Sequence, residues 1–167
     1  MDIKDKMRES QSSIIDALAE CEEQIGALYE EFSKSVQDSR SFWENLAREE
    51  NQHAALLRTL KKNLAKGSIF FNLGHFSDER LGAMTTLVNA ELTLARCHNT
   101  NHARALETAV KIEDWLLESK FYDFVTSDSQ EFQIIARKLS GDTQRHINLI
   151  QNAVAALPRG EDPKKHN

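Results

Sequence analysis

The chain contains few of the residues that interrupt helices. Its 167 residues include only two prolines, Pro158 and Pro163, and six glycines. Average usage of about 5% would give roughly eight prolines, so the sequence is depleted in this residue. Because β-sandwiches and barrels need many turns rich in glycine and proline, the depletion argues against an all-β fold and favours an all-α one.

The sequence also lacks the features of several other classes of protein. No apolar run approaches the roughly 18 residues of a membrane span, and the first residues, MDIKDKMRES, are too polar for a secretory signal. Two cysteines without a CxxC pair, Cys21 and Cys97, argue against a disulfide framework and favour a reduced, cytoplasmic setting. The net charge is −5. The basic residues between Arg58 and Lys66 lie at the end of a predicted helix, where positive charge interacts favourably with the helix dipole. We therefore expect neither a nucleic acid nor a membrane as a partner.

The periodicity of apolar residues predicts five helices joined by connections of unequal length. The expected single domain spans residues 1–157, a polar tail covers 158–167, and the helices cover about 5–37, 40–65, 78–97, 101–126 and 129–157. Short connections near residues 38 and 127 predict two antiparallel hairpins. A long crossover, residues 66–100, joins the hairpins and carries the third helix. This is the ferritin-like form of the four-helix bundle, although the periodicity also permits an ordinary up-down bundle.

Acids and histidines interrupt the apolar stripes of the four long helices. In the second, Glu50 and His53 occupy the positions between Leu46 and Leu57, one turn apart on the face that should be buried. The corresponding positions elsewhere are Glu22 in the first helix, Glu113 between Val110 and Leu117 in the fourth, and Asp142 and His146 between Leu139 and Leu149 in the fifth. Such groups are costly to bury unless they are paired, hydrogen-bonded or bound to a metal. Since glutamate and histidine are suitable metal ligands, we expect a shared cluster at mid-bundle. The alternatives are side chains that are hydrogen-bonded separately, or charges at the rim of the core.

One part of this pattern resembles a known family. The order Glu22, Tyr29 and Glu50-Asn51-Gln52-His53 is similar to the erythrin half of rubrerythrin, within the ferritin-like superfamily. In such proteins each hairpin gives a glutamate from one helix and a Glu-x-x-His from the other, and together they hold two metal ions. The resemblance implies that Glu22, Glu50 and His53 are metal ligands and that Tyr29 lies beside them.

The second hairpin departs from the family pattern. Tyr122 precedes His146 by the same separation as in the first hairpin, and this alignment places Thr143 where the family has a glutamate. Threonine is a poor metal ligand, and the neighbouring Asp142 is an alternative with a shorter arm. A one-metal, weakened or empty site therefore stays open beside a two-metal site.

The ligand from the fourth helix is also open between two acids. Glu113 has the cleaner apolar stripe and is the expected ligand, with His146 from the fifth helix. Glu118 lies beside Trp115 and Tyr122 and is the alternative.

Two functions follow from the resemblance. The first is a rubrerythrin-like metal-binding protein, an oxidoreductase or peroxidase acting on oxygen or peroxide, with iron as the metal and manganese or zinc as alternatives. Because the chain lacks the CxxC motifs of the rubredoxin-like domain, redox cycling would need an external electron donor. The second is a non-catalytic bundle that binds one metal ion or none and has a structural, metal-handling or partner-binding role. By analogy we expect a homodimer, with residues 67–76 as one candidate contact.

Overall fold

The described part of the protein is helical. The computed structural model describes residues 3–65, 78–119 and 129–158, and within these ranges there is no strand. The helices are α1 (Ile3–Ser35), a short 3-10 turn η1 (Gln37–Ser39), α2 (Arg40–Ala65), α3 (Asp78–Cys97), α4 (His102–Ser119) and α6 (Gln130–Ala155). The predicted all-α class is confirmed. The candidate contact over 67–76, the expected end of the fourth helix at 126 and most of the tail lie outside the described residues.

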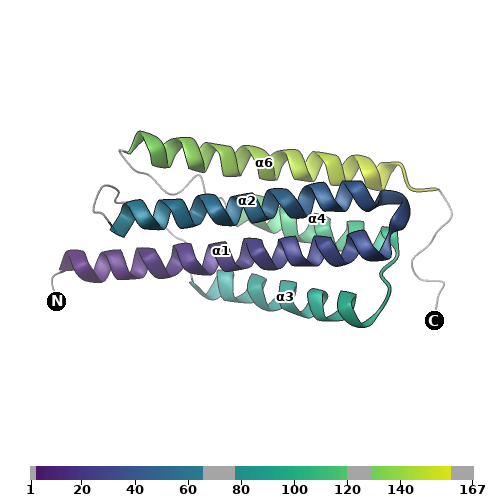
Figure 1. The fold of residues 1–167 in the computed structure, drawn as a ribbon, viewed down its shortest axis with the longest axis horizontal. Coiled ribbons are helices and arrows are strands. Elements are labelled where there is room, and N and C mark those ends of the chain that lie inside the picture. Colours follow the sequence, from purple (N-terminus) through teal and green to yellow (C-terminus); the bar gives the residue numbers. More distant parts are fainter. Residues whose placement is uncertain (1–2, 66–77, 120–128, 159–167) are drawn as a thin grey trace.

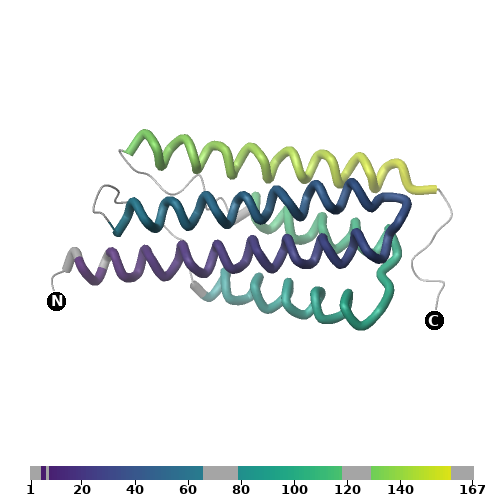
Figure 2. Tube along the Cα trace, viewed as in Figure 1, coloured from purple at the N-terminus to yellow at the C-terminus, as the bar shows by residue number. Residues whose placement is uncertain are grey.

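The helices form a bundle in which α3 lies at one edge (Figure 1). α1 packs against α2 and α3, and α6 packs against α4 and α2. The tube in Figure 2 shows the chain direction: α1, α3 and α6 run one way, and α2 and α4 run the other. α3 therefore returns the chain along the bundle before α4 begins, so that α2 and α4 are parallel while α1 with α2, and α4 with α6, are antiparallel.

The core is built from one apolar stripe on each helix. The stripes predicted for the first two helices are buried as expected, including Ile25 and Leu28 on α1 and Leu46 and Leu57 on α2. Gly26 lets these two helices approach closely, because a Cβ at that position would lie 3.2 Å from the carbonyl oxygen of Ala47. This contact is one turn of helix from Glu22 and from Glu50.

The stripes of the last two helices agree with the prediction in part: Leu139 is buried as expected, but three other positions are not. Leu149 is 41% exposed, and Ile147 and Ile150 are buried on α6 in its place. On α4, Val110 and Leu117 are only half-buried. The described helices include none that is long and apolar enough to cross a membrane.

Candidate metal centre

Four helices bring acidic and imidazole side chains to one place in the bundle interior. The residues are Glu22 from α1, Glu50 and His53 from α2, Glu113 from α4 and His146 from α6, and each is at most 2% exposed. All five were predicted from interruptions of the apolar stripes. The structure brings them together, as expected of a shared cluster.

The cluster divides into two groups that share one carboxylate. Potential ligand atoms of Glu22, Glu50 and His53 lie within 4.8 Å of one another, and the same holds for Glu50, Glu113 and His146. Oε2 of Glu50 lies 2.8 Å from Nδ1 of His53, and its Oε1 lies 2.8 Å from Nδ1 of His146. One carboxylate therefore spans two imidazoles, with a further acid on each side.

The outer nitrogen of each histidine is held by a carboxylate from the opposite helix. Nε2 of His53 on α2 lies 3.2 Å from Asp142 on α6, and Nε2 of His146 on α6 lies 2.8 Å from Glu49 on α2. The two rings stack with their centroids 5.6 Å apart. Metal-binding histidines commonly have such an outer partner, which fixes the ring and leaves the other nitrogen for the metal.

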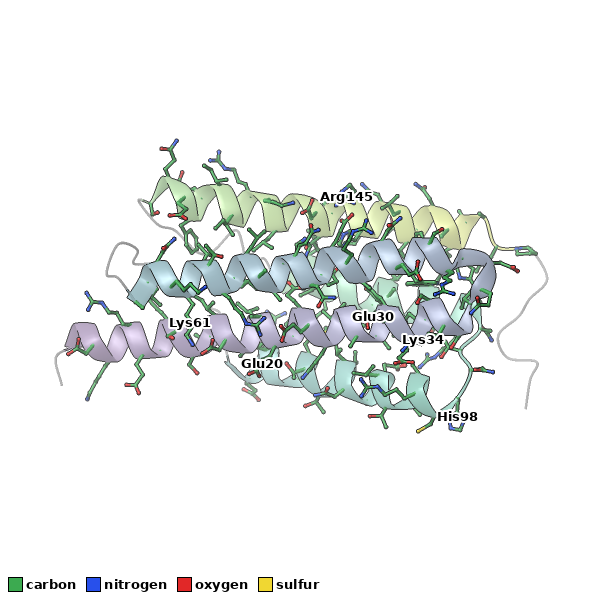
Figure 3. All side chains as sticks on the ribbon, viewed as in Figure 1. Glu20, Glu30, Lys34, Lys61, His98 and Arg145 are labelled. Atoms are coloured by element: carbon green, nitrogen blue, oxygen red, sulfur yellow. The ribbon has the colours of Figure 1, made fainter. Side chains whose placement is uncertain are left out.

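Basic side chains hold these outer carboxylates at the surface. Arg145, labelled in Figure 3, forms ion pairs with Glu49 and, at 3.1 Å, with Asp142. Lys138 adds a contact to Asp142 at 2.7 Å. These partners, with burial opposing them, lower the pKa of Asp142 to about 2. Both outer carboxylates are therefore anionic and fixed in place.

Asp142 is thus placed outside the two groups of potential ligand atoms. The sequence left it open as an alternative ligand, and the structure instead places it as the partner of His53. A step of one residue rotates a side chain by about 100° around a helix, so Asp142 points to the side of the cluster while its neighbour points inward.

Thr143 occupies the inward position on α6. It is buried, and its Oγ1 donates a hydrogen bond to the carbonyl oxygen of Leu139 at 3.0 Å. The hydroxyl is therefore engaged by its own helix, and Thr143 is absent from both groups of potential ligands. The side chain of Glu118, the alternative ligand on the fourth helix, lies outside the part of the chain that the structure describes.

Tyr29 lies beside the cluster, as the resemblance implies. Its ring is fully buried against Trp43, with the centroids 5.6 Å apart, and its hydroxyl donates a hydrogen bond to Oε1 of Glu113 at 2.9 Å. Burial and the nearby carboxylates hold the pKa of Tyr29 well above its usual value. It is therefore a neutral donor that orients Glu113.

Strong electrostatic coupling joins the buried groups. Burial alone would favour neutral imidazoles, but hydrogen bonds and charge from Glu50 raise the pKa of His53 to about 9. Glu113 and Glu50 together raise the pKa of His146 to about 11. Burial raises the pKa of Glu50, but the two histidines outweigh it and hold that pKa below its usual value. Burial and the charge of Glu50 raise the pKa of Glu113. Without metal, the centre is a buried glutamate held between two imidazolium rings.

Several buried atoms of the cluster lack a hydrogen bond from the described residues. Oε2 of Glu113, Oε1 of Glu50 and Nδ1 of His146 are shielded from solvent and form no hydrogen bond within the described ranges, although the last two atoms lie 2.8 Å apart. A buried carboxylate oxygen without a partner is costly. A cation beside it would remove that cost, and the surrounding set of three carboxylates and two imidazoles suits iron, manganese or zinc. The residues present therefore fit a metal centre.

The sequence pattern did not predict two residues of the network around the cluster, Glu49 and Arg145. A signal for the first was present, because Glu49 precedes His53 by four residues, as Asp142 precedes His146. The repeated acid at this spacing pairs across the helices rather than within one helix. Arg145 carries no signal of its own in the sequence.

Comparisons of the chain with protein-family models, with curated proteins and with solved structures gave no match. The chemistry of the centre is therefore inferred from its own residues and their geometry.

Proposed function

We propose that the protein is a ferritin-like metal carboxylate protein that binds two transition-metal ions, iron or manganese, between α1, α2, α4 and α6. The observation that carries this proposal is the position of Glu50, whose two oxygens each face the Nδ1 atom of a different histidine. In a two-metal site Glu50 would help to hold both ions. Glu22 with His53 would hold one ion, and Glu113 with His146 would hold the other.

The directions of the helices support the ferritin-like arrangement. In this arrangement two antiparallel hairpins are joined by a long crossover, so that the second and third helices of the bundle are parallel. α2 and α4 have this relation, and α3 belongs to the crossover (Figure 1). Each hairpin then contributes one histidine and at least one acid to the centre.

The proposed activity is that of an oxidoreductase or peroxidase. A carboxylate-bound pair of iron ions supplies redox chemistry toward oxygen or peroxide. The protein's own residues orient the ligands through Glu49, Asp142 and Tyr29. Apolar packing around Tyr29 and Trp43 excludes water from one side of the centre. An external electron donor would complete the cycle.

The proposal is tested by counting the bound metal ions in variants in which glutamine, an uncharged residue of the same shape, replaces a glutamate. Metal-free protein is titrated with Fe(II) without oxygen, or with Mn(II), and the bound metal is counted per folded chain. We expect two ions in the wild type, one in Glu22→Gln, one in Glu113→Gln, and loss of both in Glu50→Gln. Glu30→Gln and His98→Gln, whose exposed side chains are labelled in Figure 3, serve as controls and should keep two ions.

The outcome that would overturn the proposal is equally specific. If the wild type binds no more metal than Glu50→Gln, and both are equally helical by circular dichroism, the centre is not a metal site. If Glu22→Gln and Glu113→Gln each retain two ions, Glu50 does not divide the ligands as proposed.

A second candidate function is a non-catalytic bundle with a single metal ion. The observation that favours it is Thr143, which takes the place of a second shared glutamate. In that case the wild type binds one ion, one of the two single-acid variants keeps it and the other loses it. Oxidation of the Fe(II)-loaded protein by peroxide then separates the two functions, because only the two-metal centre should turn over repeatedly with an added reductant.

A further inference from the structure

Apolar residues occupy two opposite faces of α3. One face packs into the bundle through Leu81, Met84, Val88, Leu92 and Ala95, which are buried. The opposite face carries Ala83, Leu87, Ala90 and Leu94, spaced by four, three and four residues, and all four are exposed. We call these four residues the outer stripe. Leu87 is 43% exposed and Leu94 51%.

Between Gly82 and Leu94 the surface along the outer stripe carries no exposed charge, and the exposed Arg80 lies one turn before Ala83 on the same line. The exposed residues from 82 to 94 are glycine, alanine, threonine, leucine and asparagine. Glu91 is the one charged residue in this range; it is half-buried and pairs with Arg104 at 2.7 Å. Single exposed leucines are ordinary on protein surfaces. An uncharged stretch from 82 to 94 with two exposed leucines on one line is less common, and it is typical of a protein contact.

The threonines beside the outer stripe add to its apolar character. Oγ1 of Thr86 donates a hydrogen bond to the carbonyl oxygen of Gly82, and Oγ1 of Thr93 donates to that of Asn89, each at 2.8 Å. Hydroxyls bonded to their own helix need no partner from outside. A molecule that covers this surface therefore need not supply hydrogen bonds to these two hydroxyls.

We propose that the outer stripe is the contact between two copies of this chain, paired antiparallel through α3. Large and small residues alternate along the stripe, from Ala83 to Leu87 to Ala90 to Leu94. A two-fold axis perpendicular to the helix places Ala83 opposite Leu94 of the second copy, and Leu87 opposite Ala90. Each leucine then faces an alanine, which lets it fill the space that the small residue leaves.

The ends of α3 favour the antiparallel over the parallel pairing. In the antiparallel register the exposed acid Glu79 near the start of the helix faces His98 of the second copy, just beyond the helix end. The two helix dipoles are also opposed, which is favourable. A parallel pair would instead place Glu79 next to Glu79 of the second copy, and each leucine and alanine would face the same residue of the second copy.

Oligomeric state in solution tests whether the outer stripe is the contact. By sedimentation over a wide concentration range, we expect the full chain to show a concentration-dependent dimer. The double variant Leu87→Glu with Leu94→Glu should weaken dimerisation about a hundredfold or more, because it buries unpaired carboxylates in the contact. Leu149→Glu on α6, another exposed leucine, is the matched control and should dimerise as the wild type does. A wild type that is monomeric throughout, or a dimer that survives the double variant, would overturn the proposal.

Disulfide trapping tests the register. In a Cys97→Ser background, which removes the exposed native thiol, one sample carries Ala83→Cys and a second carries Leu94→Cys. On mild oxidation, a mixture of the two should form a disulfide between unlike chains at least about ten times faster than either alone, since only facing Cβ atoms lie within disulfide reach. A faster reaction of Ala83→Cys with itself would show a parallel pair and overturn the antiparallel arrangement.

Discussion

Metal loading is expected to release protons from the two histidines of the centre. In the metal-free protein the pKa of His53 is about 9 and that of His146 is about 11. Both rings are therefore protonated at pH 7. The nitrogen that faces Glu50 must lose its proton before a metal can bind there. We expect about two protons to leave the histidines of each chain when two ions bind at pH 7.

The pKa values set how the affinity depends on pH. Between pH 7 and 9 both histidines must be deprotonated by the metal, so the overall constant for two ions should rise about a hundredfold for each pH unit. Above pH 9 His53 is already neutral, and the rise should fall to about tenfold for each unit until the pKa of His146 is reached. Removing the proton from His53 at pH 7 costs about 3 kcal/mol, since the pKa lies two pH units higher.

Calorimetry in a series of buffers measures this proton release directly. Mn(II) is titrated into metal-free protein at one pH in buffers of different ionisation enthalpy, and the slope of the observed heat against that enthalpy gives the number of protons. His98→Gln, which removes an exposed histidine, should give the same slope as the wild type. The coupling between Glu50 and the histidines would be refuted if two ions bind, the slope is zero and the metal affinity does not change between pH 6 and 8.

Three further predictions follow from the same contacts. The pKa values of His53 and His146 are raised in the folded state, so their stabilisation of the metal-free protein is complete below about pH 6.5 and is lost as pH rises through 9 and 11. Urea unfolding should therefore show that the free energy of unfolding of the metal-free protein falls over that window, while that of the metal-loaded protein stays the same. Glu49→Gln and Asp142→Asn should each weaken metal binding about 10- to 100-fold, through His146 and His53 respectively, as measured by competition with a chelator. Thr143→Glu should destabilise the metal-free protein by about 3–5 kcal/mol in urea unfolding, because it adds a fourth carboxylate to three that are already buried in the cluster, and metal should restore the loss. Thr143→Gln, the neutral control, should lose less stability and gain nothing from metal.

The stripes of the first hairpin could be predicted because the spacing of apolar residues along a long amphipathic helix shows which face is buried. Ile25 and Leu28 on α1 and Leu46 on α2 repeat at helical spacing, and the interruption at Glu50 and His53 was therefore visible. The same reasoning found the acids on α1 and α4, although it could not show how close they lie to one another.

The prediction for α6 was wrong at Leu149 for a geometric reason. Ten residues separate it from Leu139, which leaves the two side chains about 80° apart around a helix. Ile150 is eleven residues from Leu139, close to three full turns, and it is the residue that is buried. A stripe with a long polar interruption must be extended by angle rather than by the next leucine.

Contacts between helices were beyond prediction from the sequence. Glu49 meets His146 and Asp142 meets His53 across α2 and α6, between residues far apart in the chain. Which acid turns inward and which meets the outer nitrogen depends on the rotation of each helix in the bundle. That rotation is set by packing against neighbouring helices, and it cannot be read from the sequence of one helix alone.

Electron paramagnetic resonance of the Mn(II)-loaded protein tests the central claim most directly, namely that Glu50 is shared by two ions. With two Mn(II) ions per chain, a shared carboxylate predicts a magnetically coupled spectrum that spreads well beyond the six lines of an isolated ion. In Glu113→Gln, which should keep one ion, the coupled spectrum should give way to six isolated lines. A six-line spectrum from fully loaded wild-type protein would contradict the shared site.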